Sequence, residues 1–313
     1  MRAAVVMEPG AVPVVAEFPE PEAAPGRETA RVVAAGIHPV VRSMAAGTHY
    51  GSAGGYPLVP GVDCVARFPD GTLRYAGFTT SPWGTLAERV VVPGGIPLPG
   101  GADPLAIAGG LNPGMSSWLP LSARRAELGE LGTVLVLGAT GVAGRMAVQF
   151  ARILGATRVV AVGRDAERLA AVAALGADPV ELATGAEGIA AALGDEAPST
   201  ILDFVWGVAA EAAWGALARR GLEDDTADIE HIEIGAAGGQ TAALPAALLR
   251  SRRMRVRGSG AGASPIEQIM RELPVLMGHI AAGRVTVPVA AYPLHDIGAA
   301  WAHGPGERAV VTF

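Results

Sequence analysis

Between residues 133 and 234 the chain repeats one pattern, in which a short apolar strand is followed by a glycine turn and an alanine-rich helix. The sequence predicts strands at 133–137, 158–162, 200–205 and 230–234, and helices at 142–154, 166–175 and 209–218. Strands and helices that alternate at this spacing form right-handed βαβ units. The pattern therefore predicts an α/β domain with a doubly wound parallel sheet.

The rest of the chain has a different texture. Residues 1–110 hold only short helical stretches and several short β-like runs between Gly and Pro residues, at 3–7, 29–34, 62–68 and 86–92. After about residue 264 the sequence predicts a helix to about 282, a strand near 285–291, a short helix from Asp296 and a strand at 309–313. We expect these last pieces to fold back onto the N-terminal β domain, so that the parallel sheet is an inserted central domain.

Composition excludes several classes of function. All 24 basic residues are Arg, so a P-loop, a Schiff base and kinase catalysis lack their lysine. Cys64 is the single cysteine, which forbids an intrachain disulfide and a cysteine-rich zinc site, and favours a small buried side chain in a cytoplasmic protein. A net charge of −6 without a long basic stretch argues against nucleic acid, and every apolar run is interrupted before it reaches membrane-spanning length.

A glycine motif follows the expected strand at 133–137 and opens the next helix. It consists of Gly138, Ala139, Thr140, Gly141, Val142, Ala143 and Gly144. A turn without side chains lets backbone N–H groups and the helix N-terminus meet a pyrophosphate. The strand before it and the βαβ unit around it favour dinucleotide binding over a plain glycine turn.

The end of the second strand favours NADPH over NADH. An NAD site places an acidic residue about 20 positions beyond the glycines, where it accepts from the ribose 2′-hydroxyl. Here Gly163 takes that place, and Arg164 follows as a planar partner for a 2′-phosphate. Asp165 is the counter-argument, and we interpret it as the N-cap of the next helix. The alternative is that Arg164 is simply solvated.

The order of these parts resembles the medium-chain dehydrogenase/reductase superfamily over essentially the whole chain. The segments that carry the resemblance are 35–39, 60–63, 84–93, 114–118, the glycine motif and 175–178. The resemblance implies a GroES-like β domain from residues 1–112 and 259–313, and a Rossmann NADP-binding domain from residues 113–258. It also implies a homodimer that pairs the edge strands of two Rossmann sheets.

The zinc-containing dehydrogenases of this superfamily hold zinc with two cysteines and a histidine, next to an acidic residue. The matching positions here are His38, Val62 and Asn112, with Asp63 beside them. Valine cannot bind zinc, and one histidine with an asparagine is a poor ligand set. The chain therefore resembles the zinc-less branch, which is similar to quinone oxidoreductases, alkenal reductases and enoyl reductases, and we predict no metal site.

The catalytic candidates lie in the N-terminal domain. His38 is expected to hydrogen-bond the substrate or cofactor and to donate a proton, or else to be a structural loop histidine. Tyr50 falls near a substrate-contacting position of quinone reductases, where it reprotonates an enolate or forms an aromatic lid. Asn112 offers its amide to a substrate carbonyl, or else forms a turn before Pro113.

Further cofactor contacts are implied by the resemblance. Ser116 matches a hydroxyl that contacts the nicotinamide, unless it caps a helix. Backbone groups of Val205, Gly235 and Ala236 follow Rossmann strands and would hold the ribose and carboxamide, and the segment around Ser259 would complete that site or merely cross between domains. The arginines between 250 and 257 are interpreted as solvated or as complementing a helix end.

Without a Lewis acid, the acceptor must be activated by its own conjugation. The sequence thus predicts a zinc-independent, NADPH-dependent oxidoreductase that delivers hydride to a quinone or an α,β-unsaturated carbonyl. One alternative is an enoyl or alkenal reductase that acts as a tailoring enzyme of secondary metabolism. Another is a dinucleotide-binding redox sensor with little turnover.

Overall fold

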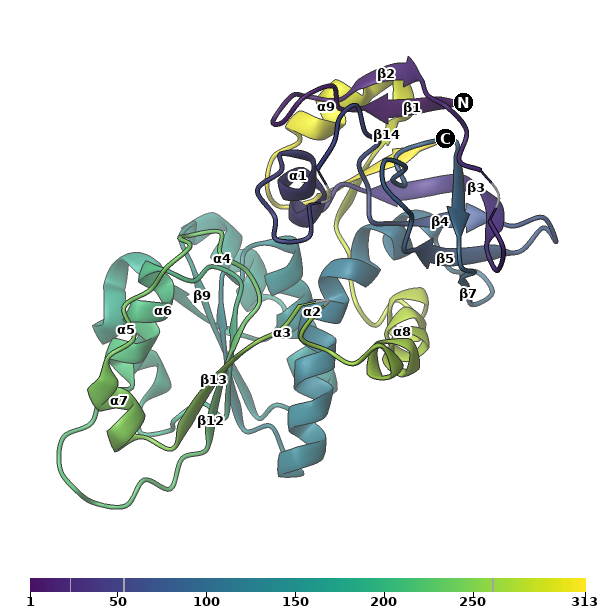
Figure 1. Cartoon of the computed structure of the whole chain (residues 1–313). Helices are drawn as coiled ribbons and strands as arrows, with labels where there is room; N and C mark the ends of the chain where they lie inside the picture. The colour runs from purple at the N-terminus through teal and green to yellow at the C-terminus, as the bar shows by residue number, and fades with distance from the viewer. Residues whose placement is uncertain (23, 53, 261) are drawn as a thin grey trace. The chain divides into compact units, whose positions relative to one another are not determined.

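The structure, a computed structural model, describes residues 1–22, 24–52, 54–260 and 262–313 (Figure 1). Its contacts divide the chain into two units. Unit 1 contains Met1–Pro113 and Leu273–Phe313, and unit 2 contains Gly114–Glu272. This division leaves residues 259–272 with unit 2, whereas the sequence analysis assigned them to the β domain.

Unit 2 is built on a parallel sheet of six strands in the order β10-β9-β8-β11-β12-β13 (Figure 1). The strands are β8 (Thr133–Leu137), β9 (Arg158–Gly163), β10 (Asp178–Glu181), β11 (Thr200–Asp203), β12 (Ile229–Glu233) and β13 (Met254–Gly258). The strand order reverses between β8 and β11, and a doubly wound sheet binds its ligand outside the carboxyl ends of the strands at such a point. The predicted fold class is confirmed.

Helices cover both faces of this sheet. They are α3 (Val142–Ile153), α4 (Ala166–Ala173), α5 (Gly185–Leu193), α6 (Val208–Ala216) and α7 (Ala246–Ser251), with a 3-10 turn η1 (Leu182–Thr184). The small buried residues of α6 and its Trp214 pack in one cluster with Leu135 of β8 and Ile201 of β11. Strand β11 ends two residues before the predicted position, because the Asp203 carboxylate accepts the backbone N–H groups of Val205 and Trp206.

The sequence analysis missed the longest helix, α2 (Pro104–Leu128), so the prediction that helical stretches before residue 110 are short is wrong. Its internal Pro and Gly residues made this helix hard to predict from the sequence, because both residue types lower helix propensity. Its glycines serve packing instead: a Cβ on Gly109 would lie 2.6 Å from Val289, and one on Gly110 would lie 2.6 Å from Val287. No helix in the described part of the chain is long and apolar enough to cross a bilayer.

Unit 1 contains the antiparallel sheet β14-β15-β3-β4-β5-β7, in which β6 also pairs with β3 and only β14 and β15 run parallel. The strands are β3 (Glu28–Gly36), β4 (Asp63–Arg67), β5 (Leu73–Gly77), β6 (Arg89–Val92), β7 (Ile96–Pro97), β14 (Val289–Pro293) and β15 (Arg308–Thr312). A separate pair, β1 (Arg2–Val5) and β2 (Val14–Glu17), lies in the same unit. Val310 of β15 lies opposite Gly36 of β3, so the two ends of the chain share one sheet.

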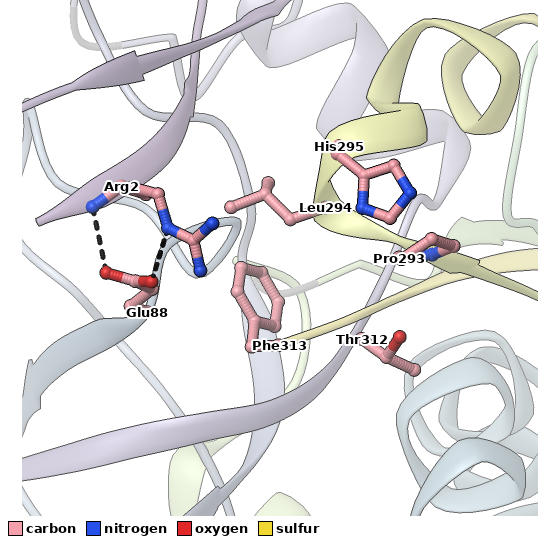
Figure 2. A pocket seen from close by; sticks show the side chains of 7 residues that line it. All are labelled: Arg2, Glu88, Pro293, Leu294, His295, Thr312 and Phe313. Carbon is pink, nitrogen blue, oxygen red and sulfur yellow. Dashed lines mark hydrogen bonds and ion pairs between the residues drawn. The ribbon is translucent and has the colours of Figure 1, made fainter.

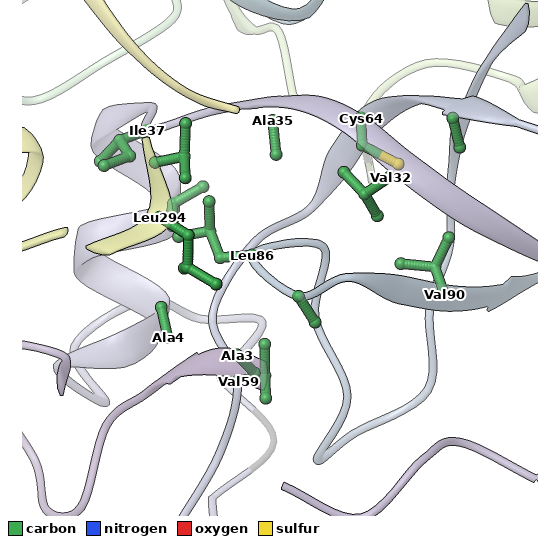
Figure 3. Close-up of a cluster of buried hydrophobic side chains, with 14 of the residues drawn as sticks. Ala3, Ala4, Val32, Ala35, Ile37, Val59, Cys64, Leu86, Val90 and Leu294 are labelled. Atoms are coloured by element: carbon green, nitrogen blue, oxygen red, sulfur yellow. The ribbon is translucent and has the colours of Figure 1, made fainter. Parts of the chain in front are cut away.

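Short helices complete unit 1, namely α1 (Pro39–Ala45), η2 (Leu294–Asp296) and α9 (Ile297–Ala302), and α8 (Ile266–Ala281) crosses the boundary between the units. Figure 3 shows the core of unit 1, where Ile37, Cys64 and Leu86 lie among the strands. Cys64 is fully buried, which confirms its predicted role as a small apolar side chain. Burial, with a smaller contribution from the Asp63 carboxylate, raises the pKa of this thiol.

Candidate active site

The three glycines of the predicted cofactor turn occupy different surroundings. Gly138 has a φ of 83°, a conformation that only glycine adopts easily. A Cβ on Gly144 would lie 2.3 Å from the Gly138 carbonyl oxygen, so the helix approaches the turn too closely for any side chain. A Cβ on Gly141 would meet nothing closer than 3.6 Å. Packing therefore explains Gly138 and Gly144, whereas Gly141 leaves open space.

Helix α3 begins at this turn without a side-chain cap. Gly141 is its N-cap residue, with extended backbone, and in the described part of the chain no side-chain cap hydrogen bond forms at this end of the helix. Val142 and Ala143 are the first helical residues, and Thr140 precedes the cap. An uncapped N-terminus of a twelve-residue helix presents free donors and a positive dipole end, which suits a pyrophosphate. The residues therefore fit a dinucleotide.

The carboxyl end of β9 lies beside the same turn. A Cβ on Gly163 would lie 2.6 Å from the Thr140 methyl group, so only glycine lets the two segments meet. Arg164 is exposed and has no ion pair within the described residues. Asp165 accepts the Arg168 N–H at 3.0 Å as the N-cap of α4, which confirms that part of the sequence interpretation. Arg168 also places a second guanidinium here, 3.5 Å from the Asp165 carboxylate.

The predicted residues at the ends of β11 and β12 are already engaged with one another. Val205 donates its N–H to Asp203, and its carbonyl accepts from Gly238 at 2.6 Å. The Gly235 N–H donates to the Asp203 carbonyl at 3.2 Å, and Ala236 follows directly. The bonds from the Gly235 and Gly238 N–H groups thus join the segments after β11 and β12, whereas the Val205 N–H bonds to a side chain of its own strand. The N–H groups of Val205 and Gly235 are already used, so carbonyl lone pairs and side chains remain for a ligand.

Ser116 and Ser259, far apart in the sequence, come together in unit 2. The Ser259 hydroxyl donates to the Ser116 carbonyl at 3.4 Å, and the Ser259 N–H donates to the Glu233 carbonyl at 2.7 Å. Ser116 lies in the middle of α2, so the alternative that it caps a helix is wrong. The segment at Ser259 is tied to the carboxyl end of β12 rather than crossing freely.

In unit 1, His38 is paired with Asp63. His38 Nε2 lies 3.2 Å from Asp63 Oδ1, and the side chains are 1% and 5% exposed. His38 Nδ1 has no hydrogen-bond partner in the described structure, and no donor reaches Asp63 Oδ2 with good hydrogen-bond geometry. The Tyr75 hydroxyl faces this carboxylate: burial and then the Asp63 carboxylate raise the pKa of this phenol. Gly36 makes room for the imidazole, because a Cβ there would lie 2.7 Å from the ring. A buried pair with one unused atom on each partner is suited to proton transfer.

The other two catalytic candidates occupy different settings. Tyr50 is 81% exposed and stacks on His49, with their ring centroids 4.0 Å apart. Asn112 lies inside helix α2 and is half-buried, so the alternative that it forms a turn before Pro113 is wrong. Within the described residues neither side chain forms a hydrogen bond. Their proposed roles toward substrate remain predictions.

The residues of unit 1 do not fit a catalytic zinc ion. Val62 carries no ligand atom, the His38 nitrogen nearest to Asp63 is already paired, and Cys64 is a buried core residue. Among residues 1–22, 24–52, 54–260 and 262–313, no group of three or more His, Cys, Asp or Glu side chains could hold a metal ion. A tetrahedral zinc site needs at least three protein ligands.

A shallow pocket in unit 1 is a separate feature (Figure 2). Its walls include Leu294, His295 and Phe313, and its charged residues Arg2 and Glu88 are joined by two hydrogen bonds of 2.8 and 2.9 Å. None of the predicted site residues lines it. The pocket is therefore not part of the candidate active site.

The arginines between 250 and 257 are mostly ion-paired within unit 2. Arg255 and Arg257 lie in strand β13 rather than at a helix end, and both contact Glu230, at 3.2 and 2.8 Å. Arg252 lies 3.2 Å from Asp225. The helix-end interpretation is wrong for Arg255 and Arg257, which lie in a strand. It is confirmed for Arg252, which is the C-cap residue of α7 and donates from Nε to the carbonyl of Leu217, the C-cap residue of α6, at 2.8 Å.

Sequence reasoning missed one group at the sheet edge, the buried pair of Asp203 and His231. Their side chains are 0% exposed and lie 3.0 Å apart. The sequence signal that could have found this pair is Asp203, an acidic residue at the end of an apolar parallel strand. A buried carboxylate needs hydrogen-bond partners, so a donor such as His231 is expected nearby.

Comparison with known proteins agrees with this geometry. The family model for zinc-binding dehydrogenases matches residues 143–274, which lie almost entirely in unit 2 and do not include the positions that would hold zinc. The chain is 30% identical to the probable NADPH-dependent quinone reductase tdiC of Emericella nidulans, and the alignment covers 96% of each protein.

Solved structures extend the likeness. The quinone oxidoreductase from Thermus thermophilus, solved also in complex with NADPH, is 28% identical with a TM-score of 0.81 over 100% of both chains. A probable oxidoreductase from Mycobacterium abscessus is 25% identical with a TM-score of 0.79, over 100% of this chain and 99% of that one. On these findings the protein belongs to the medium-chain dehydrogenase/reductase superfamily, in its quinone reductase-like branch.

Proposed function

We propose that this protein is an NADPH-dependent oxidoreductase that transfers hydride to a quinone or another conjugated carbonyl, without zinc. The observation that carries the proposal is the presence in one chain of an open, uncapped glycine turn in unit 2 and a buried His38–Asp63 pair in unit 1. The quinone reductases of Emericella nidulans and Thermus thermophilus support the choice of cofactor and acceptor.

NADPH would be held by the edge of the unit 2 sheet. The N–H groups of Val142 and Ala143 at the start of α3 would bind the pyrophosphate, and Gly163 would leave room for the adenosine ribose. Arg164, exposed and without an ion pair in the described structure, would bind the 2′-phosphate. Ser116, Val205, Gly235, Ala236 and Ser259 would surround the nicotinamide half.

His38 would act on the acceptor. The reduced nicotinamide supplies the hydride, and the acceptor then needs one proton to become the neutral hydroquinone or enol. As an imidazolium, His38 donates through Nδ1 while Asp63 holds its Nε2–H and offsets its charge. Asp63 acts through His38 and is a positioning residue. Asn112 and Tyr50 would orient or cover the acceptor.

The direct test is NADPH oxidation by a panel of quinones, alkenals and enoyl thioesters, followed by the loss of absorbance of the reduced nicotinamide. We expect turnover with quinones, no effect of a zinc chelator, and no stoichiometric zinc by metal analysis. Turnover only with alkenals or enoyl thioesters would favour a conjugated-alkene reductase. NADPH binding without turnover would favour a redox sensor, and stoichiometric zinc that supports activity would overturn zinc independence.

We also propose that the protein works as a homodimer in the cytoplasm. Strand β13 is the last strand in the order of the unit 2 sheet, so one side of it can pair with the same strand of a second copy. The single thiol, Cys64, is compatible with a reducing compartment. Light scattering during gel filtration tests the assembly, and a monomeric mass would contradict it.

A further inference from the structure

Three buried side chains form a continuous hydrogen-bonded chain beneath the carboxyl edge of the unit 2 sheet. Trp214 of α6 donates from Nε1 to His231 Nδ1 at 3.0 Å, and His231 Nε2 lies 3.0 Å from Asp203 Oδ2. His231 and Asp203 are 0% exposed and Trp214 is 1% exposed. The three residues come from helix α6 and from strands β12 and β11, so the chain links separate elements.

The direction of these hydrogen bonds follows from their chemistry. An indole N–H can only donate, so His231 Nδ1 must be an acceptor without a proton. The imidazole is then neutral, with its proton on Nε2, and it donates to an Asp203 carboxylate that can only accept. Both ring nitrogens of His231 are satisfied, so the chain orients the carboxylate.

The Asp203 carboxylate, once oriented, also holds the backbone of the segment that follows β11. Its Oδ1 accepts from the N–H groups of Val205 and Trp206, at 2.9 and 2.8 Å. Trp206 has a φ of 58°, which is costly for a bulky L-residue. Its ring packs edge-on against Trp214, with centroids 5.3 Å apart. The network therefore holds a backbone conformation that the segment would not adopt by itself.

Val205 connects this segment to the glycine turn. A Cβ on Gly138 would lie 2.5 Å from Val205 Cγ2, so the valine side chain lies directly against the first glycine of the turn. A Cβ on Gly238 would lie 2.6 Å from Val205 Cγ1. A displacement of Val205 must therefore displace the glycine turn, the loop at Gly238, or both.

We propose that Trp214, His231 and Asp203 form a positioning network for the nicotinamide half of the NADPH site. The inference rests on the proposed function. In a doubly wound sheet the two halves of a dinucleotide lie on either side of the reversal in strand order. The network lies on the β11–β12 side, whereas Gly163 and Arg164 lie on the β9 side. It should therefore affect one half of the cofactor selectively.

The test uses Trp214→Phe, which keeps an aromatic ring and removes the indole donor. Trp118→Phe is the matched control, because Trp118 Nε1 donates to a Glu272 carboxylate oxygen at 3.0 Å within the same unit. Two ligands are titrated into the full-length protein: NADPH, and adenosine 2′-monophosphate, which carries the adenosine and the 2′-phosphate but no 5′-phosphate for the glycine turn. His231→Gln, which retains a donor toward Asp203, serves as the conservative variant.

We expect Trp214→Phe to raise the Kd of NADPH by about tenfold, the equivalent of one hydrogen bond to a buried network. The Kd of the monophosphate should stay within about twofold of wild type. Trp118→Phe should change neither, and His231→Gln should weaken NADPH less than His231→Leu. An unchanged NADPH affinity, or an equal loss for both ligands, would overturn the inference. If wild type binds the monophosphate but not NADPH, the proposed function fails and the network has no cofactor to position.

Discussion

Each unit contains one buried histidine paired with an aspartate, and the two pairs differ in what remains unpaired. In unit 2, His231 is bonded through both nitrogens and Asp203 accepts through both oxygens. In unit 1, His38 Nε2 contacts Asp63 Oδ1 at 3.2 Å, whereas His38 Nδ1 and Asp63 Oδ2 have no hydrogen-bond partner in the described structure. A contact between histidine and carboxylate therefore does not by itself identify a catalytic pair.

The difference follows from the cost of burial. A buried polar atom without a partner costs about 1–3 kcal/mol unless a water or a ligand completes it. The satisfied pair stabilises and positions the backbone around it. The incomplete pair is suited to exchange a proton with a substrate. The unpaired Nδ1 of His38 therefore distinguishes the proposed proton donor from the positioning pair of Asp203 and His231.

The largest expected difference between the pairs is in stability. Asp203→Ala removes the acceptor of three buried donors, from Val205, Trp206 and His231, and should lower the free energy of unfolding by about 4 kcal/mol. Asp63→Ala removes the carboxylate that contacts His38 at 3.2 Å and faces the Tyr75 hydroxyl, and should cost about 2 kcal/mol. Urea unfolding followed by circular dichroism measures both. Equal losses would show that the extra partners of Asp203 contribute nothing.

Asp63→Asn should separate catalysis from stability. The amide preserves the shape of the carboxyl group and can still accept from His38, but it removes the negative charge that offsets an imidazolium. We expect kcat for quinone reduction to fall by about 30-fold while the Kd of NADPH is unchanged. Steady-state kinetics at saturating NADPH tests this. An unchanged kcat, or a rise in the Kd of NADPH that accounts for the loss, would contradict a positioning role for Asp63.

The sequence predicted the repeating parts of the molecule and missed the contacts that depend on packing. Strand β8 and the start of α3 lie where the pattern placed them, and Asp165 caps α4, because local periodicity and capping determine these features. The sequence analysis missed helix α2, because Pro and Gly weaken an isolated helix. In the folded protein these residues lie inside a helix that packing stabilises.

The two histidine pairs could not be predicted for a different reason. His38 and Asp63 are 25 residues apart, and Asp203 and His231 are 28 apart, so only the folded sheets bring them together. Motif matching identified His38 and Asp63 as positions that correspond to zinc ligation, but it contained no information about their contact. It gave no sign of Asp203 and His231 at all.

Arg164→Ala tests the adenine half of the cofactor site independently of both pairs. Loss of the guanidinium should raise the Kd of NADPH by about tenfold and leave the Kd of NADH within about twofold, because only NADPH carries the 2′-phosphate. Calorimetric titration measures both constants. Arg168→Ala is the comparison variant, because the Arg168 guanidinium already forms an ion pair with the Asp165 carboxylate. A parallel loss for both cofactors would argue against a phosphate contact.

The smallest expected effect concerns Cys64, whose pKa is raised first by burial and then by the Asp63 carboxylate. The unfolded thiol ionises as the pH rises past its ordinary value of 9.0, whereas the folded thiol keeps its proton. The folded state then binds more protons, so stability falls by at most about 1.4 kcal/mol per pH unit. Cys64→Ala should remove this part of the alkaline slope. An identical slope in the variant would show that the thiol does not contribute.

The central claim is that the unpaired Nδ1 of His38 donates a proton to the acceptor, and single-turnover reduction of a quinone by prebound NADPH tests it most directly. His38→Gln keeps a donor toward Asp63 but cannot form an imidazolium. We predict that this variant binds NADPH like wild type and reduces the quinone about 100-fold more slowly, while Tyr50→Phe stays within about threefold. A parental rate in His38→Gln, or a large loss confined to Tyr50→Phe, would contradict the account.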